Sequence, residues 1–557
     1  MPEITWTHPG LGRYVGIRAL LRITALAVLF SPGSAVAQAA TWVPLHDPAY
    51  ADLDVIIAGG LVREIITGER PYASSLFARA AAEARAAATA NSTDPRAPQL
   101  PARSLEALSR LEARFGAGAR ARSRGVALLS SWADSPTRPV PEDPRLWATA
   151  TGSLIDADIA PLLQRNLGVD LRDGGTVVAT AWRDASLGSR FAASVAPRLW
   201  FGTDGGGAAG LAVDHAYVRG VFGNVAVTVG RNAVVHGHAR ELGTALSTNV
   251  RGLDMVRLSM DRPGRLPWIL RHLGPASGAA TVATLGPNRA EEWSTLIVWE
   301  GAVRPHRNFE LGVTLMNQQG GNGAPEATVW ERILEVFFLH KRAAPGTTGL
   351  PPDPNIGDKL IGMNAQWTIP GPKLEVFAEV TTTDDHDLFV SRPEETFWYE
   401  AAWAVGLRRF ALGREGRWDL WAEAGRVGVR TYAHHQMTSG LTLDRRIIGS
   451  PLGPLAAGFT AGTDWTGARD RVSLSGAWER YSRDRWAVIR APDWHWFRTA
   501  DNPDEIRVRG TVDWAREPAA TGLRTTVRLG YEHVTRFDFT DRNRSNFLAQ
   551  VGVGWVW

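Results

Sequence analysis

The segment Asp493-Trp494-His495-Trp496-Phe497 places three aromatic residues, a histidine and a carboxylate side by side. Flat aromatic faces stack on the C–H surfaces of pyranose rings, and the flanking Arg490 and Arg498 could bind sugar hydroxyls or uronate carboxylates. We therefore take this segment as a candidate sugar-binding site. Its predicted contact residues are Arg490, Trp494, His495, Trp496 and Arg498. An aromatic girdle or a packed cluster within a loop would use the same residue types and is the alternative.

A run of acidic residues is a candidate site for a divalent cation. Asp384, Asp385 and Asp387 could ligate a hard divalent cation such as Ca²⁺ through their carboxylates. Adjacent residues rarely converge on one ion, and the spacing of an EF-hand loop is absent. The run therefore favours a solvated loop tip over a metal site.

Two histidine pairs could supply metal ligands, namely His236 with His238 and His434 with His435. A zinc site needs further ligands, and no third ligand can be identified for either pair. Polar packing within loops is therefore the favoured interpretation, and His434 and His435 remain candidates for sugar contacts. No metal is expected.

The patterns that mark common catalytic sites are absent. The sequence has no Gly-x-Ser-x-Gly elbow, no His-Glu-x-x-His and no phosphate-binding loop. Carboxylate pairs such as Glu394 with Glu395 occur, but a sequence does not set the separation that glycoside hydrolysis needs. The chain contains no cysteine, which excludes thiolate catalysis and disulfides. These observations give no catalytic site, so the chain is expected not to be an enzyme and to use no cofactor.

Strands are the elements expected to carry these loops, because apolar residues recur at every second position from about Leu146 to the end of the chain. One face of the last stretch holds Phe547, Ala549, Val551, Val553, Trp555 and Trp557. A terminal strand of this kind, ending on an aromatic residue, is typical of bacterial outer-membrane barrels. We assign the outer-membrane insertion signal to Phe547, Val553, Trp555 and Trp557.

Earlier segments repeat the two-residue period. Their apolar faces include Leu374, Val376, Ala378 and Val380; Phe397, Tyr399, Ala401, Trp403, Val405 and Leu407; Val472, Leu474 and Trp478; Val508, Val512 and Trp514; and Val527, Leu529 and Tyr531. A soluble β-sandwich would also alternate. Here, however, charged residues such as Arg507, Arg509 and Glu532 fall on the opposite face, where they would line a polar lumen. The pattern predicts an antiparallel outer-membrane β-barrel.

Connection lengths support this prediction, because outer-membrane barrels have short periplasmic turns and long external loops. The expected short connections are Pro370–Pro372, Gly413–Arg417, Gly467–Asp470 and Glu517–Gly522. Between them lie the expected long connections Thr382–Glu395, Thr431–Pro454, Ser482–Glu505 and Asp538–Asn546. The alternation predicts an even number of about 16 to 18 strands within residues 145–557.

The residues before the barrel predict a leader and a helical segment. Arg13, Arg18 and Arg22 precede the apolar stretch Ile23–Phe30 and the small residues Ala35-Val36-Ala37, so residues 1–37 are expected to be a removed signal peptide. Residues 38–140 are expected to form about three short periplasmic helices, because apolar residues recur there at helical spacing. The chain is therefore expected to be exported to the outer membrane of a Gram-negative-type bacterium.

Composition agrees with a barrel without proving one. The mean hydropathy is −0.15, with 57 glycines and 23 tryptophans among 557 residues. No 18-residue apolar run follows the leader, which argues against helical membrane spans. The formal net charge of +4 argues against nucleic acid as a partner.

Several local patterns, in this order, resemble the Wzi family of capsule-assembly outer-membrane proteins. They are Trp42-Val43-Pro44, Asp47-Pro48-Ala49-Tyr50, Arg70-Pro71-Tyr72, Val229-Gly230-Arg231-Asn232, Leu246-Ser247-Thr248-Asn249, and a run from Tyr432-Ala433-His434-His435 to Ile448-Gly449-Ser450-Pro451-Leu452-Gly453. Two positions depart from the family pattern. Val235-His236-Gly237-His238 stands where a tryptophan-glycine pair is frequent, and Ser450 stands where histidine is commoner.

The resemblance implies an 18-stranded barrel with a periplasmic helical bundle, external loops that close the lumen, and binding of capsular polysaccharide. A repeating polymer offers many equivalent epitopes, so individually weak contacts would suffice. The expected partners are capsular or other surface polysaccharide, outer-membrane lipid and lipopolysaccharide, and the barrel-assembly machinery. Two rival functions stay open at this point: a diffusion channel with an open lumen, and an outer-membrane glycan or lipid hydrolase.

Overall fold

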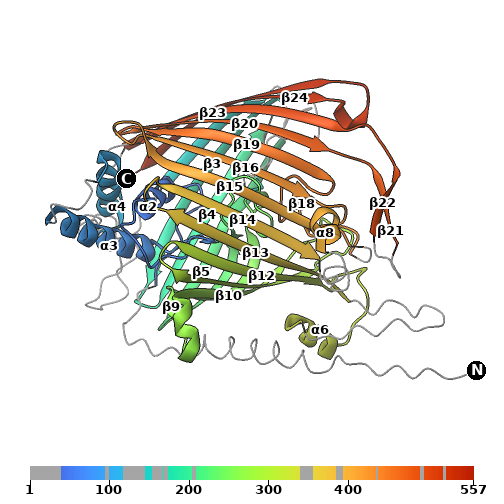
Figure 1. The fold of residues 1–557 in the computed structure, drawn as a ribbon, viewed down its shortest axis with the longest axis horizontal. Helices are drawn as coiled ribbons and strands as arrows, with labels where there is room; N and C mark the ends of the chain where they lie inside the picture. Colours follow the sequence, from blue (N-terminus) through green and yellow to red (C-terminus); the bar gives the residue numbers. More distant parts are fainter. Residues whose placement is uncertain are drawn as a thin grey trace, which may run out of the picture.

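The computed structural model describes residues 39–93, 100–116, 145–153, 167–168, 174–202, 208–338, 356–383, 393–434, 437–489, 495–517 and 522–556. Eighteen antiparallel strands close into one barrel (Figure 1). In chain order they are β2 (Arg145–Ser153), β3 (Gly174–Leu187), β4 (Phe191–Gly202), β5 (Ala208–Phe222), β6 (Val225–Asn232), β8 (Leu253–Met260), β10 (Pro275–Thr284), β11 (Thr295–His306), β12 (Phe309–Gln319), β13 (Gly357–Ile369), β14 (Leu374–Thr383), β15 (Ala401–Leu412), β16 (Trp418–Val427), β19 (Ala456–Thr466), β20 (Asp470–Tyr481), β23 (Glu505–Arg516), β24 (Gly522–Thr535) and β25 (Arg544–Val556).

The barrel closes between the last strand and the first. β25 pairs with β24 on one side and with β2 on the other, and Trp555 lies opposite Leu146 in the second pairing. Closure leaves no unpaired strand edge, which is the condition for placing a sheet in lipid. The predicted fold class, an antiparallel barrel of 16 to 18 strands preceded by helices, is confirmed.

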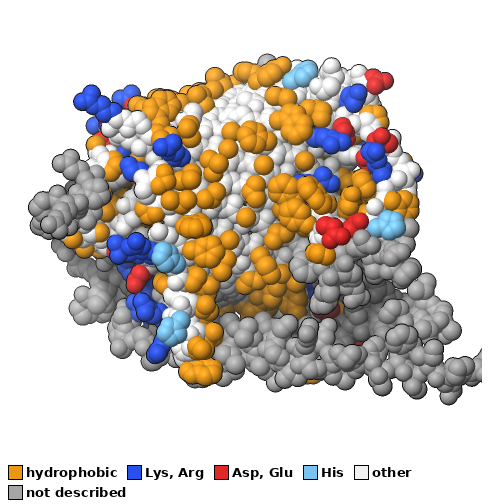
Figure 2. All heavy atoms as spheres, viewed as in Figure 1, with side chains coloured by type: hydrophobic (Ala, Val, Ile, Leu, Met, Phe, Trp, Pro, Cys, Tyr) orange, Lys and Arg blue, Asp and Glu red, His pale blue; other side chains and the backbone are white. Residues whose placement is uncertain are grey.

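The outer surface of the barrel is apolar, as the strand alternation predicted. On β25, Phe547, Val551 and Val553 are 40–48% exposed, whereas Leu548 is 1% exposed. Figure 2 shows apolar side chains spread over the strands of the visible face. Phe547 and Val553 of the predicted insertion signal thus face outward, whereas the side chain of Trp555 and the whole of Trp557 lie outside what the structure describes.

One predicted strand boundary is wrong. Phe397 and Tyr399 belong to η4 (Thr396–Glu400), one π-helical turn after α8 (Pro393–Glu395), and β15 begins only at Ala401. The backbone of this segment is π-helical, and the amide of Val429, just after β16, donates to the carbonyl of Tyr399 at 2.6 Å. The ring of Phe397 stacks on Trp403. In the sequence, Phe397 and Tyr399 continue the two-residue alternation of β15 although they precede the strand.

The connections separate the barrel into two ends. We call the end with the turns 188–190, 223–224, 307–308, 370–373, 413–417, 467–469 and 517–521 the short-turn end. The opposite long-loop end carries the connections 233–252, 320–356, 384–400, 428–455 and 482–504. The alternation predicted for the last eight connections is confirmed. Short turns face the periplasm in outer-membrane barrels.

Three helices lie at the short-turn end, namely α2 (Ala49–Ala58), α3 (Ser74–Thr93) and α4 (Ala102–Phe115) (Figure 1). They share a core that includes Leu53, Phe77 and Leu108. The guanidinium of Arg103 on α4 donates to both carboxylate oxygens of Asp419 on β16 at 2.6 Å, which fixes the helices to the barrel. No helix in the described part of the chain is long and apolar enough to cross a membrane.

The remaining elements lie inside the barrel or in its loops. They are β1 (Glu69–Arg70), β7 (Val235–His236), β9 (Gly264–Arg265), η3 (Trp268–Leu273), α6 (Val329–Val336), β17 (Thr442–Leu443), β18 (Arg446–Ile447), β21 (Arg485–Ile489), β22 (His495–Ala500) and η5 (Phe537–Phe539). β1 pairs with β7, so a segment that precedes the barrel joins an external loop within the lumen.

Candidate functional site

The loop 233–252 crosses the lumen. It starts at β6 and returns to β8, yet it binds side chains of β14, β16 and β19 on the opposite wall. The Glu379 carboxylate accepts from the amides of His238, Ala239 and Thr244, the second at 2.7 Å. The Glu423 carboxylate accepts in the same way from the backbone amides of residues 240–242. Two carboxylates of the barrel wall therefore hold the backbone of this loop.

The Glu423 contacts are equally specific. Its carboxylate accepts from the amides of Arg240, Glu241 and Leu242 at 2.7, 2.9 and 3.1 Å. The side chain of Arg240 then reaches Asp464 on β19 at 2.6 Å. Hydrogen bonds to a charged acceptor are stronger than neutral ones, so the loop is held firmly across the barrel.

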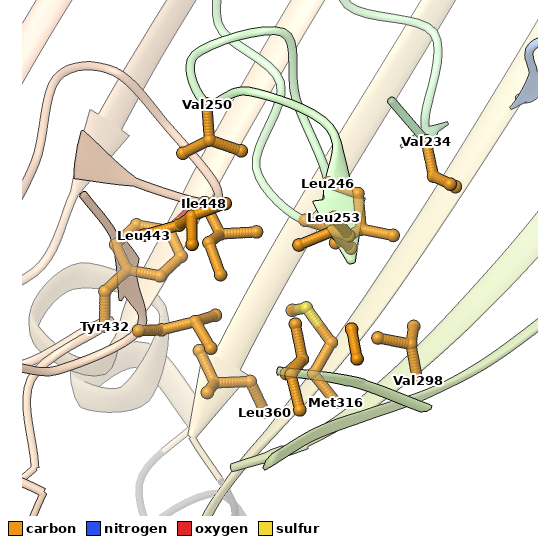
Figure 3. Close-up of a cluster of buried hydrophobic side chains, with 14 of the residues drawn as sticks. Val234, Leu246, Val250, Leu253, Val298, Met316, Leu360, Tyr432, Leu443 and Ile448 are labelled. Carbon is orange, nitrogen blue, oxygen red and sulfur yellow. The ribbon is translucent and has the colours of Figure 1, made fainter. Parts of the chain in front are cut away.

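The loop 428–455 meets it over the lumen. The Ser247 hydroxyl donates to the carbonyl of Gly449 at 2.6 Å, and the Asn249 amide group donates to the carbonyl of Ile447 at 2.9 Å. Tyr432 donates its hydroxyl to the carbonyl of Thr244. Figure 3 shows the apolar cluster beneath these contacts, in which Leu246, Ile448 and Leu360 lie together. We call the two loops and this cluster the lumenal plug.

A cationic pocket opens above the plug at the long-loop end. Its volume is about 730 Å³, within the range of small-molecule sites. Its lining consists of Gly168, Arg251, Asn288, Arg289, Ser439, Leu443, Asp444, Arg445 and Arg446. We call it the arginine pocket, because four of these nine residues are arginine.

The turn that presents two of these arginines is set by local backbone geometry. β17 and β18 form a hairpin joined by Asp444 and Arg445, whose φ angles are +48° and +64°. Two left-handed residues in succession define the tight turn that matches the twist of a hairpin. The turn directs Arg445 outward, where it is exposed.

Asp444 and Arg289 make the pocket floor rigid. The Asp444 carboxylate accepts from Arg251 at 2.6 Å and from the Asn288 side chain at 3.1 Å. The buried Arg289 guanidinium donates to the carbonyls of Thr442 and Gly440, both at 2.9 Å. Arg289 is therefore committed to structure, whereas Arg445 is directed toward solvent.

Glu291 anchors the same loop from the β10–β11 connection. It accepts from the amide and hydroxyl of Thr438 at 2.6 and 2.8 Å, and from the amide of Ser439 at 3.3 Å. Burial alone raises the pKa of Glu291, but these hydrogen bonds outweigh it and hold the pKa below its ordinary value. The anchor thus works in its ionised form.

The chemistry of the pocket favours anions. An arginine guanidinium presents donors in a planar fork that matches a carboxylate, and several forks around one cavity give both charge and direction. A uronate or other acidic sugar supplies such a carboxylate together with hydroxyls that the pocket's polar groups can bind. The described residues contain no group of three or more side chains placed to hold a metal ion.

The predicted sugar-binding segment forms part of the β21–β22 hairpin. His495 is half-buried and Trp496 is buried, with its amide donating to Glu395 at 2.8 Å. The Trp496 ring lies against Tyr399, with 6.3 Å between centroids. Arg498 is exposed and pairs with Asp501 at 2.9 Å. The described part of this segment is thus a loop cluster with one arginine at its surface.

The other predicted site residues are dispersed. His434 lies on loop 428–455, where its Nδ1 accepts from the amide of Met437 at 3.3 Å. His236 is buried beside Asn364 in the lumen, which agrees with polar packing. The remaining candidates lie outside the described residues, namely Asp384, Asp385, Asp387, His435, Arg490 and Trp494.

The arginine pocket itself was missed by the sequence interpretation. Its residues come from four connections, so no single stretch is rich in them. The one local signal is Leu443-Asp444-Arg445-Arg446, a basic tight turn between short strands. Arg251 and Arg289 carry no signal of their own.

Comparison with known proteins agrees with the fold. The family model for capsule assembly protein Wzi matches residues 155–548, which is most of the chain. Among solved structures, Escherichia coli Wzi is similar at 13% identity and a TM-score of 0.64, over 92% of this chain and 99% of that one. It is an outer-membrane protein involved in group 1 capsule assembly and a carbohydrate-binding β-barrel.

More distant barrels are also similar. Pseudomonas aeruginosa OprD aligns at 10% identity and a TM-score of 0.41, over 74% of this chain and 95% of its own. Acinetobacter baumannii OccAB4 aligns at 8% identity and a TM-score of 0.38, over 75% and 98%. No curated protein sequence matches the chain.

Proposed function

Because this chain belongs to the Wzi family of capsule assembly proteins, we propose that it is an outer-membrane protein that attaches or organises capsule-like polysaccharide at the cell surface. The arginine pocket is the observation that carries the proposal. It lies at the long-loop end, which faces the exterior in outer-membrane barrels. E. coli Wzi, which has a similar fold, is a carbohydrate-binding barrel.

The polysaccharide that suits this pocket carries carboxylates. Arg445 and Arg446 line the pocket, and the tight turn holds their backbone in place. A carboxylate on a sugar ring would pair with a guanidinium fork while its hydroxyls bind Asn288 and Ser439. One such contact is weak, but a polymer that engages many barrels on one cell gains avidity.

The β21–β22 hairpin is proposed as a second contact area. Arg498 lies at its surface, and His495 is partly accessible. Trp494, Arg490 and Trp496 complete the predicted sugar-binding set. His434 and His435, on the same loop as Arg445, are proposed to extend the area used by the polymer.

The proposal is tested by removing charge at the pocket mouth. Arg445→Gln together with Arg446→Gln should weaken binding of an acidic polysaccharide by roughly 10- to 100-fold, since one charge-assisted hydrogen bond contributes about 1.5–3 kcal/mol. The matched control is Arg536→Gln with Arg542→Gln, which removes two exposed arginines of loop 536–543 at the same end. Binding is measured on the purified barrel, and cell-attached and shed polysaccharide are measured after complementing a gene deletion.

Two results would count against the proposal. One is unchanged attachment of polysaccharide in cells that lack the protein. The other is equal loss of binding in the pocket variant and the control variant, which would mean that general surface charge is responsible.

Further parts of the proposal concern chemistry and export. We propose that the protein binds its glycan without turnover, so purified barrel and acidic polysaccharide should yield no shorter products. We also propose that residues 1–37 are a cleaved leader, that 38–140 form a periplasmic segment and that 145–557 form the transmembrane unit. The barrel-assembly machinery would recognise β25, and outer-membrane lipid and lipopolysaccharide would surround the barrel.

A further inference from the structure

One connection at the short-turn end differs from the others. The turns at this end have two to five residues, but β8 and β10 are joined by residues 261–274, which include β9 and η3. η3 projects from the barrel beside β9 (Figure 1). The β8–β10 connection is therefore much longer than the other turns at this end.

The segment exposes large apolar side chains. Trp268 is 85% exposed, Ile269 is 63% exposed, and Leu273 is 38% exposed. No residue of η3 is buried. Apolar side chains that project from a connecting segment without packing on the protein are unfavourable in water, so this surface is built for contact with something else.

Arginine residues flank these apolar side chains along the chain. Arg262, Arg265 and Arg271 lie within the same connection, and Arg307 is exposed on the next turn. The one carboxylate of the connection, Asp261, is buried and paired with Arg219 at 2.7 Å. The surface is therefore basic without a compensating acidic group in its own segment. At the lower left, Figure 2 shows basic and histidine side chains beside apolar ones, with an acidic side chain among them.

Exposed arginines at three other turns of the short-turn end have acidic neighbours. Arg414, Arg469 and Arg516 are each followed in the sequence by a carboxylate residue. Of the three, Arg516 forms an ion pair with Asp470 at 4.0 Å. The β8–β10 connection has three arginines and no exposed carboxylate of its own, so the segment is cationic.

The segment also continues the apolar outer face of the barrel. Val256 on β8, Val282 on β10 and Leu311 on β12 are exposed outward on strands around it. Tryptophan side chains are enriched where hydrocarbon meets water, and basic residues beside them attract anionic lipid headgroups.

We propose that η3 and its flanking arginines, the η3 anchor, bind anionic phospholipid headgroups in the membrane leaflet at the short-turn end. Trp268 and Ile269 insert at the level of the headgroups. Arg262, Arg265 and Arg271 pair with the phosphates. The anchor fixes the depth and rotation of the barrel at its periplasmic rim, on the opposite side of the membrane from the polysaccharide pocket.

The test uses the absence of cysteine from the chain. Ile269→Cys provides a single thiol for a polarity-sensitive fluorophore in the full-length barrel, reconstituted in nanodiscs. The discs contain phosphatidylcholine with a small fraction of either brominated phosphatidylglycerol or brominated phosphatidylcholine as quencher. Each arginine near an anionic surface contributes about fivefold to lipid affinity, so three should favour the anionic quencher by roughly 100-fold.

The variant and its control each replace three arginines of the short-turn end by glutamine, and they differ only in which connections carry these arginines. Arg262→Gln, Arg265→Gln and Arg271→Gln together should abolish the preference for phosphatidylglycerol. Arg414→Gln, Arg469→Gln and Arg516→Gln together should retain it. Retained heat-modifiable migration on gels shows that each variant is a folded barrel.

Three outcomes would overturn the proposal. The first is equal quenching by both lipids in the labelled protein that keeps all its arginines, and the second is a loss of lipid preference in the Arg414, Arg469 and Arg516 control as large as in the η3 variant. The third is protection of the fluorophore that depends on protein concentration and not on lipid. The last outcome would assign the surface to a second copy of the chain.

Discussion

The two carboxylates that hold loop 233–252 allow a quantitative prediction. In Glu379→Gln with Glu423→Gln, each side chain keeps one acceptor oxygen and exchanges the other for an NH₂ group, which cannot accept. Each glutamate serves three backbone amides in the native barrel, so each loses at least one hydrogen bond and the charge that strengthens the others.

The cost follows from the strength of these bonds. A hydrogen bond to a charged group contributes about 1.5–3 kcal/mol and a neutral one about 0.5–1.5 kcal/mol. Part of the loss is offset because a neutral amide is easier to bury than a carboxylate. A net cost of about 2–3 kcal/mol per site should raise local opening of the loop by roughly 30- to 150-fold per site.

Hydrogen exchange of the backbone measures this opening directly. Peptides that contain His238 to Leu242 should exchange faster by the stated factor in each single variant, and by roughly 10³- to 10⁴-fold in the double variant. A peptide from β20 serves as the internal reference, since it does not belong to the loop. Conductance across planar bilayers should show brief openings in the double variant.

A matched substitution separates the loop contacts from the loss of lumenal charge. Glu532→Gln removes one buried carboxylate whose partner, Asn546, lies on the neighbouring strand. This variant should leave exchange at residues 238–242 unchanged. Unaltered exchange in the Glu379 and Glu423 variants, with the barrel still folded, would refute the reasoning that these side chains hold the plug.

Three further predictions concern the contacts around the plug. Asp54→Asn should weaken the docking of α2 by about 2 kcal/mol, seen as earlier proteolysis of the helices on heating, because Asp54 pairs with one arginine from β1 and one from β15. Tyr432→Phe should destabilise loop 428–455 by about 1–3 kcal/mol in thermal unfolding, because the buried carbonyl of Thr244 loses its donor. The lowered pKa of Glu291 means that its stabilising contribution is present above its ordinary value of 4.5 and is lost as pH falls below that. Loop 428–455 of the native protein should therefore become protease-sensitive in acid. In Glu291→Gln the loop should already be protease-sensitive at neutral pH, and its sensitivity should change little as the pH falls.

The strands could be predicted because lipid and lumen impose opposite demands on alternate residues. On β24, Leu529 and Tyr531 face outward while Glu532 is buried, as the two-residue period indicated. The error at Phe397 has the same origin. A π-helical turn of aromatic residues in a loop imitates an alternating strand when only residue types are compared.

The lumenal plug could not be predicted from the sequence by the same means. The bond from Ala239 to Glu379 joins residues 140 positions apart, and loop 233–252 has no period that reveals its partners. The residues that resemble family motifs, such as Ser247 and Tyr432, were noticed as patterns, but their role became visible only as contacts across the lumen. Ser247 and Tyr432 lie on different loops, and each contacts the other loop across the lumen.

The lumenal plug and the arginine pocket share loop 428–455, which contributes residues to both. Loop 428–455 fills the lumen with Leu441 and Ile448 and, a few residues away, turns outward at Arg445. A diffusion channel would need these loops to leave the lumen, and the pocket would then lose its floor. A rigid plug instead holds the arginines in one arrangement, which lowers the entropy lost when a flexible polymer binds. Closing the barrel and presenting the site are thus consequences of the same contacts.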